Sequence, residues 1–174
     1  KEKIVSDRIA HSLETLQARI GYTFKRDYLL PRVLRAPDAE MRDEESNLMS
    51  HNGRLEGIGD MVIRAFIYRF LDGHVDVREG TRKALLQARS QGHLIDILNS
   101  NSYMSLCGQH LRLNEHLYIS KNRSRYSSGD ARARHFSDAF EAFVGVLYID
   151  HEVKIPYRLM SDLLFLFKLL KSNL

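Results

Sequence analysis

The sequence has few or none of the features that define several large protein classes. Its 174 residues include one cysteine, Cys107, which excludes an internal disulfide and favours a reducing, intracellular compartment, with cytoplasm and organelle matrix both open. No apolar run approaches the roughly 18 residues of a membrane span, and the N-terminus lacks the apolar core of a signal peptide. Gly-rich phosphate loops and nucleophile elbows are missing too. We expect no membrane partner and no exported, disulfide-bonded scaffold.

What is present is the composition of one globular domain, with 44% hydrophobic and 28% charged residues. Apolar residues recur at helical spacing, beginning with Ile9, Leu13, Leu16 and Ile20, and no segment alternates as a strand would. The spacing predicts an all-α fold, with helices starting near Lys25 and covering about 61–71, 81–99, 136–150 and 157–171. Residues 61–71 are apolar on almost every side, which predicts a helix buried in the middle of the domain.

The net charge of +4 is unevenly distributed. The segment from Lys121 to Arg134 alone carries +4, so the rest of the chain sums to zero. Such runs are usually solvated loops, but they also suit the binding of phosphates. The basic residues of this segment are Lys121, Arg123, Arg125, Arg132 and Arg134.

Two helical segments carry acids that oppose the electrostatics of their own helices. Glu56 and Asp60 are four residues apart, and Asp138 and Glu141 are three apart, so each pair shares one helix face. Like charges at such spacing destabilise a helix by roughly 0.2–0.5 kcal/mol.

Two explanations of these acids are open. Arg64 follows Asp60 by four residues and Arg134 precedes Asp138 by four, so each acid has a possible partner for an ordinary intrahelical ion pair. Alternatively, the two segments pack side by side and form a cleft whose oxygen-only ligands suit Mg²⁺, with Mn²⁺ as a possible substitute. Such ions would offset the charge repulsion and activate a water molecule as a nucleophile.

Three segments together resemble the ribonuclease III family. Asn52 to Asp60 (NGRLEGIGD) is similar to that family's signature, usually N-E-R-L-E-F-L-G-D, and an apolar helix follows it. Ser137 to Asp150 resembles the second motif, a D-x-x-E-A helix that ends in a G-x-x-Y/F-x-D phrase, and Ile20 to Ala39 resembles the opening G-Y-x-F segment. Order and spacing agree from about residue 16 to residue 170, so we expect one endonuclease domain over 1–174 with its core at about 16–170.

The resemblance implies a magnesium-dependent endoribonuclease that cuts double-stranded or structured RNA and leaves 5′-phosphate and 3′-hydroxyl ends. It implies that Glu56 and Glu141 hold the catalytic ion directly, and that Asp60 and Asp138 complete the site directly or through water. Glu79 resembles an accessory acid near the scissile phosphate. The basic segment just before the second motif is then placed to bind the phosphates of duplex RNA.

Two glycines depart from the family pattern. Gly53 stands in place of the first glutamate of the signature, and Gly57 in place of a bulky hydrophobe that joins two subunits. We expect a homodimer, with a heterodimer of two ribonuclease III-like chains as the alternative. We expect a single endonuclease domain without a separate double-stranded-RNA-binding domain, as in mini-ribonucleases III or organellar RNA-processing types, and a first residue other than Met suggests a longer parent.

Two other functions compete with that of an active nuclease. The departures at Gly53 and Gly57 are compatible with an inactive family member that serves as a scaffold or RNA-binding subunit of an RNA-processing or ribosomal assembly. Retention of all the metal-binding acids argues against it. An unrelated helical adaptor would leave the three ordered motif matches as coincidence.

Overall fold

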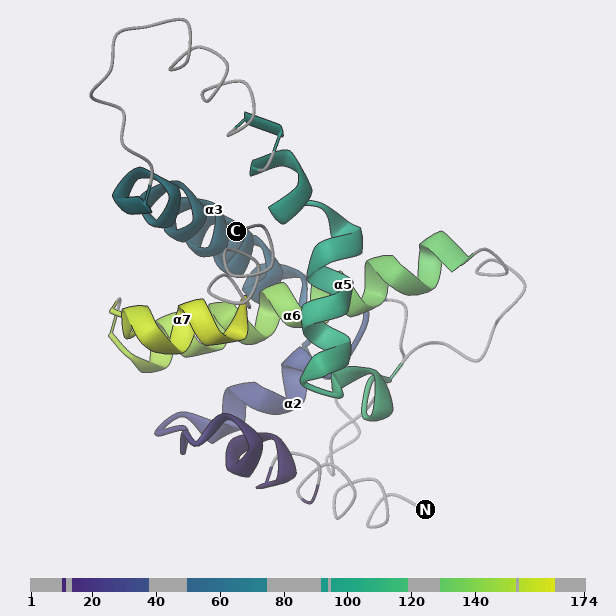
Figure 1. Cartoon of the computed structure of the whole chain (residues 1–174). Helices are drawn as coiled ribbons and strands as arrows, with labels where there is room; N and C mark the ends of the chain where they lie inside the picture. The colour runs from purple at the N-terminus through teal and green to yellow at the C-terminus, as the bar shows by residue number, and fades with distance from the viewer. Residues whose placement is uncertain are drawn as a thin grey trace, which may run out of the picture.

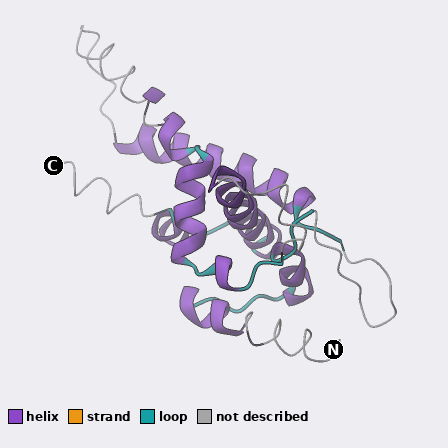
Figure 2. Cartoon of the chain, turned by 90° about the vertical axis from the view of Figure 1, so that its right-hand side faces the viewer, coloured by secondary structure: helices purple, strands orange, loops and turns teal. Residues whose placement is uncertain are grey.

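The computed structural model describes residues 14–37, 50–74, 95–118, 129–152 and 154–164, together with residues 11, 92 and 93. Residues 14–20 are helical, and the further elements are η1 (Asp27–Leu29), α2 (Leu30–Val33), α3 (Gly53–His74), α5 (Asn101–His110), η2 (Leu113–Glu115), α6 (Gly129–Asp150) and α7 (Tyr157–Leu163). Over this part of the chain there is no β-strand, and the only extended pairing is an isolated bridge between Arg35 and Tyr118. The all-α prediction is confirmed (Figures 1 and 2).

Helix α6 forms the centre of the molecule, and the other long helices pack around it. In Figure 1 it runs across the middle, with α5 crossing it and α3 beside it. The packing of α3 against α6 is the most extensive, and that of α5 against α6 is the next. The middle of α6 is buried on every side; its buried apolar residues are Ala139, Phe140, Ala142, Phe143, Val144, Val146 and Leu147.

The prediction that residues 61–71 form the buried central helix is wrong, because α6 is the central helix. These residues do lie in α3, but only one face of α3 is buried, through Ile63, Ile67 and Phe70. Met61 is 65% exposed and Tyr68 is 57% exposed. Because both side chains are apolar in large part, their exposure on one helix is the unusual feature of this surface.

Two glycines allow α3 and α6 to touch backbone to backbone. A Cβ atom placed on Gly59 would lie 1.7 Å from the carbonyl oxygen of Glu141, and one placed on Gly145 would lie 2.2 Å from the carbonyl oxygen of Leu55. No side chain fits at either position, which is the circumstance in which glycine is required at a close approach. The crossing lies at the acidic residues, so it sets the distance between Glu56 on α3 and Glu141 on α6.

The start of α3 is held by its neighbours in the fold. Asn52 is fully buried, and its carbonyl accepts hydrogen bonds from the N–H groups of Leu55 (2.8 Å) and Glu56 (2.9 Å). Its own N–H donates to the carbonyl of Arg35 at 3.0 Å. Glu56 is thereby fixed in the first turn of α3.

The C-terminal end of α6 binds the segment that precedes η1. Asp150 is 1% exposed, and its carboxylate accepts hydrogen bonds from the Tyr22 hydroxyl (2.6 Å) and from the N–H groups of Lys25 (3.0 Å) and Arg26 (2.7 Å). These bonds hold the pKa of Asp150 below its usual value, although burial alone would raise it. The G-Y-x-F segment and the last residue of the second motif are thus one structural unit.

The remaining helices were predicted less completely. Helix α7 confirms the beginning of the predicted 157–171 helix, of which residues up to 164 are described. Of the predicted helix over 81–99, residues 92–93 and 95–98 are helical and the others lie outside the described residues. Helix α5 was missed. Within the described ranges, no helix has the length and apolar character needed to cross a membrane.

Candidate functional site: an acidic cluster between α3 and α6

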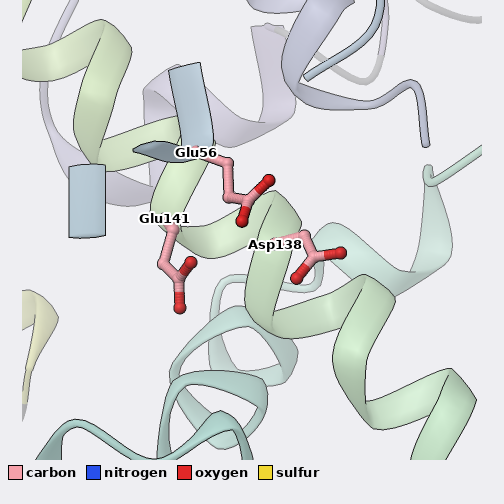
Figure 3. A group of neighbouring side chains, drawn as sticks. All are labelled: Glu56, Asp138 and Glu141. Atoms are coloured by element: carbon pink, nitrogen blue, oxygen red, sulfur yellow. The ribbon is translucent and has the colours of Figure 1, made fainter. Parts of the chain in front are cut away.

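The structure brings three carboxylates together where α3 crosses α6. One carboxylate oxygen from each of Glu56, Asp138 and Glu141 lies within 4.8 Å of the other two. Figure 3 shows Glu56 approaching from α3 and the other two side chains projecting from neighbouring turns of α6. Among the described residues, this is the only such grouping of acidic, histidine and cysteine side chains. The predicted packing of the two acidic segments is therefore present.

Glu141 is the most strongly perturbed member of the cluster. Its side chain belongs to a residue that is 8% exposed, and its Oε1 accepts a hydrogen bond from the Ser137 hydroxyl at 3.0 Å. Burial, followed by the charges of Asp60, Asp138 and Glu56, raises the pKa of Glu141 to about 7, against the opposing effect of Ser137. A carboxyl group shifted this far by burial and like charges is typical of a functional site.

The pKa values of the other two members are shifted in the same direction. Burial raises the pKa of Glu56, helped by the charges of Asp138 and Asp60 and opposed by those of His51 and Arg134. Burial also raises the pKa of Asp138, again opposed by Arg134. All three carboxyl groups are therefore harder to ionise than in water, Asp138 because of burial and the other two because of burial and neighbouring charges.

Asp60 lies near the cluster but has a partner of its own. Its Oδ1 forms an ion pair with Arg64 Nε at 2.8 Å, so the intrahelical pair predicted from the four-residue spacing is present. The charge of Asp60 still acts on Glu56 and Glu141, because it raises the pKa of both. The assignment of Asp60 as a metal ligand stays a prediction.

The donor set of the cluster fits a hard divalent cation. All three ligating groups are carboxylates, the type of ligand that Mg²⁺ prefers, and Mg²⁺ commonly keeps several waters beside one or two carboxylates. A bound cation would replace the mutual repulsion by attraction and favour the ionised forms. Because one oxygen of Glu141 is held by Ser137, the other is available to a cation.

The predicted basic residues are described only in part. Arg134 is exposed on α6, one turn before Asp138, and its charge lowers the pKa of Asp138 and of Glu56. Arg132 lies on α6, but its side chain is outside the described ones. Outside the described residues altogether are Glu79, Lys121, Arg123 and Arg125.

The sequence interpretation missed two residues of this site. Ser137 precedes Glu141 by four residues, a helical spacing that signals the hydrogen bond between them. His51 lies outside any helix, and its Nδ1 accepts a hydrogen bond from the Gly53 N–H at 3.1 Å. No spacing rule predicts that contact, because it depends on how the chain enters α3.

Comparisons with known proteins identify relatives of this chain. The family model described as the ribonuclease III domain matches residues 53–152, which include every member of the acidic cluster. A curated relative, ribonuclease 3 of Staphylococcus aureus (strain JH9), is 26% identical over 166 residues, which are 95% of this chain and 64% of that protein. The ribonuclease 3 of strain Newman gives the same values. The chain thus spans slightly less than two thirds of the length of these relatives.

Solved structures share the fold. A nuclease domain of ribonuclease III from Campylobacter jejuni, described for structural flexibility in a region involved in dimer formation, superimposes with a TM-score of 0.68. Its sequence is 19% identical, and the match covers 87% of this chain and 95% of that one. A second structure of that nuclease domain gives a TM-score of 0.66 at 20% identity.

Proposed function

Because the chain belongs to the ribonuclease III domain family, we propose that it is an endoribonuclease that uses Mg²⁺ to cut double-stranded or structured RNA during RNA processing. The single observation that carries the proposal is the cluster of Glu56, Asp138 and Glu141 at the crossing of α3 and α6. Its composition fits a cation that also binds phosphate oxygens.

Each residue of the cluster would have a separate role. Glu56, Asp138 and Glu141 would hold the ion, with Asp60 assisting through its charge or through water. When bound, Mg²⁺ would act as a Lewis acid toward a phosphate oxygen and lower the pKa of a bound water. Ser137 would keep Glu141 in its binding rotamer. Attack of water on phosphorus, with cleavage of the bond to the 3′ oxygen, would leave a 5′ phosphate and a 3′ hydroxyl.

The substrate would be held mainly through its phosphates. Duplex RNA is recognised by shape, 2′-hydroxyls and backbone more than by base sequence. Arg134, exposed beside the cluster, and Arg132 at the start of α6 would bind phosphate oxygens, together with Lys121, Arg123 and Arg125. We propose an intracellular, reducing compartment, in keeping with the free, buried Cys107.

The direct test is incubation of the purified chain with a duplex RNA of defined sequence, with and without Mg²⁺, followed by analysis of the product ends. We expect metal-dependent cutting, with ends that a 5′-phosphate-dependent exonuclease accepts. RNA binding without any cutting would favour an inactive, RNA-binding family member instead. A chain that neither binds nor cuts the duplex RNA would contradict both interpretations.

Binding of Mg²⁺ is expected to raise the unfolding temperature, because the ion binds the folded cluster and not the unfolded chain. At about ten times its Kd, the ion would add about 1.4 kcal/mol, which for a domain of this size is a shift of roughly 3–6 °C. Glu141, whose pKa is raised to about 7, must lose its proton before it binds the ion, so the shift is expected to be larger at about pH 8 than at about pH 6. Thermal unfolding at matched ionic strength measures it. A shift that survives in Glu141→Gln would contradict the assigned site.

We also propose that two copies of the chain associate through the exposed face of α3. Among the described side chains of this helix, Met61 and Tyr68 are the large exposed hydrophobic ones, and Arg64 lies between them in the sequence. Tyrosine and arginine are common anchors of protein interfaces. The Campylobacter jejuni domain has a region involved in dimer formation, which supports association as a property of this fold.

Replacement of both Met61 and Tyr68 by Asp is expected to convert a homodimer into a monomer, since two desolvated charges would face each other across the interface. Light scattering at micromolar concentration measures the mass. Tyr28→Asp is the matched control, because Tyr28 is 69% exposed on η1 and not on α3. A parent chain that is already a monomer would indicate that a different, ribonuclease III-like partner is needed.

A further inference from the structure

The imidazole of His51 lies beside the space that a side chain at position 53 would fill. A Cβ atom placed on Gly53 would lie 3.0 Å from His51 Cε1 and 3.1 Å from His51 Nδ1. The ring is held there by the hydrogen bond from the Gly53 N–H to Nδ1. That N–H is among the first of α3, which have no carbonyl partner within the helix, so the ring satisfies a donor that would otherwise need water.

The same space borders the acidic cluster. The Cβ position on Gly53 lies 3.9 Å from Oε2 of Glu56, so the His51 ring and the Glu56 carboxylate flank one small region. His51 is exposed, whereas Glu141 of the cluster is buried. The imidazole is therefore open to a ligand that comes from solvent.

The hydrogen bond to Nδ1 fixes what the ring offers to such a ligand. In a neutral imidazole one nitrogen accepts and the other carries the proton. Since Nδ1 accepts from Gly53, the proton of the neutral ring is on Nε2. Ionised carboxylates only accept hydrogen bonds, so the members of the cluster have no donor for a phosphate oxygen, whereas His51 Nε2–H is one.

A glutamate at position 53, as in the signature that this segment resembles, would compete with this arrangement. Its Cβ would begin within 3.0–3.1 Å of two ring atoms, so the imidazole would have to move. Gly53 leaves the ring in place. The imidazole of His51 therefore lies beside the space that the acid of the signature would enter.

We propose that His51 is a substrate-contacting residue, whose Nε2–H donates a hydrogen bond to a phosphate oxygen of RNA bound at the acidic cluster, and that Gly53 provides the space for the ring. The inference rests on the proposed function, because it takes RNA as the ligand of the cluster.

The experiment compares His51→Ala, His51→Gln and the control His93→Ala, which removes another exposed histidine. Loss of one hydrogen bond to a charged group is expected to lower kcat/KM by about tenfold or more in His51→Ala. His51→Gln keeps an N–H donor and is expected to recover part of that loss. Gly53→Ala is expected to give a smaller decrease, because its Cβ must push the ring aside by a few tenths of an ångström.

A second readout separates this inference from the proposed function. Duplex RNA binding is measured for the Glu141→Gln protein with and without His51→Ala, so that no cleavage is needed. Weaker binding with His51→Ala supports the contact even if the parent chain does not cut. Cutting by the parent with no change in His51→Ala, in either kcat/KM or binding, overturns the inference and leaves the nuclease assignment intact. Loss of activity that follows only a lowered unfolding temperature, without rescue by His51→Gln, also overturns it.

Discussion

Glu141→Gln is expected to abolish cleavage of duplex RNA, with a loss of more than about 100-fold, because even residues that only support a metal ligand are typically worth 10–100-fold. The amide has the shape of the carboxylate and keeps an oxygen that accepts from Ser137, so the side chain stays in place. What is lost is the negative charge that would hold the cation. The measurement is the initial rate of cutting at saturating Mg²⁺.

The thermal stability of the metal-free Glu141→Gln protein is expected to stay the same or to rise, whereas its cleavage activity falls. Because the pKa of Glu141 is raised in the folded chain, its ionised form destabilises the metal-free protein once the pH exceeds the pKa of the unfolded state. The neutral amide removes that cost, so without metal the variant should unfold at the same or a higher temperature above about pH 7. Glu115→Gln, at an exposed glutamate paired with Arg112, is the matched control. An active Glu141→Gln protein would contradict the assignment of the site.

Gly59→Ala is expected to destabilise the fold by about 3 kcal/mol or more, since a methyl group 1.7 Å from the Glu141 carbonyl oxygen must push two helices apart. For a domain of this size that corresponds to a fall in unfolding temperature of roughly 6–12 °C. Circular dichroism at 222 nm, in the helical region, follows the transition. RNA cleavage should fall too, because the separation between Glu56 and Glu141 increases.

Gly57→Ala is the control on the same helix, two residues away. A Cβ atom on Gly57 meets nothing within 4 Å, so the substitution adds helix propensity without a clash. It is expected to stabilise the chain by roughly 0.5–1 kcal/mol. Equal effects of the two substitutions would mean that α3 and α6 do not cross at Gly59.

The sequence predicted the helical fold and the convergence of the acids because both depend on regular spacing. Apolar residues at helical intervals predicted residues 136–150 of α6 and 61–71 of α3. Carboxylates on single helix faces allowed a shared cleft of Glu56, Asp60, Asp138 and Glu141, and all of these except Asp60 meet in the acidic cluster. The motif order supplied the pairing of the two segments. Spacing alone did not place the glycines at the crossing, which are recognised only when both backbones are present.

The errors also have physical reasons. Helix α5 was missed because few of its residues are strongly apolar; its start is instead fixed by Ser100, whose hydroxyl accepts from the Tyr103 N–H at 3.2 Å. Apolar content alone overestimates the burial of α3, because it does not distinguish buried apolar residues from exposed ones such as Met61 and Tyr68. Asp60 pairs with Arg64, as its four-residue spacing predicted, and its charge still raises the pKa of Glu141.

Contact between main chains at Gly59 and Gly145 leaves no layer of side chains through which α3 and α6 can slide. Side-chain layers yield by changing rotamers, whereas two helical backbones in contact have no such adjustment. The acids therefore lie on two helices whose relative position is rigid. Small movements of the helices do not relieve the repulsion between the carboxylates. A cation bound as proposed would meet carboxylates whose separation is already set by the fold, so little reorganisation energy would oppose its binding.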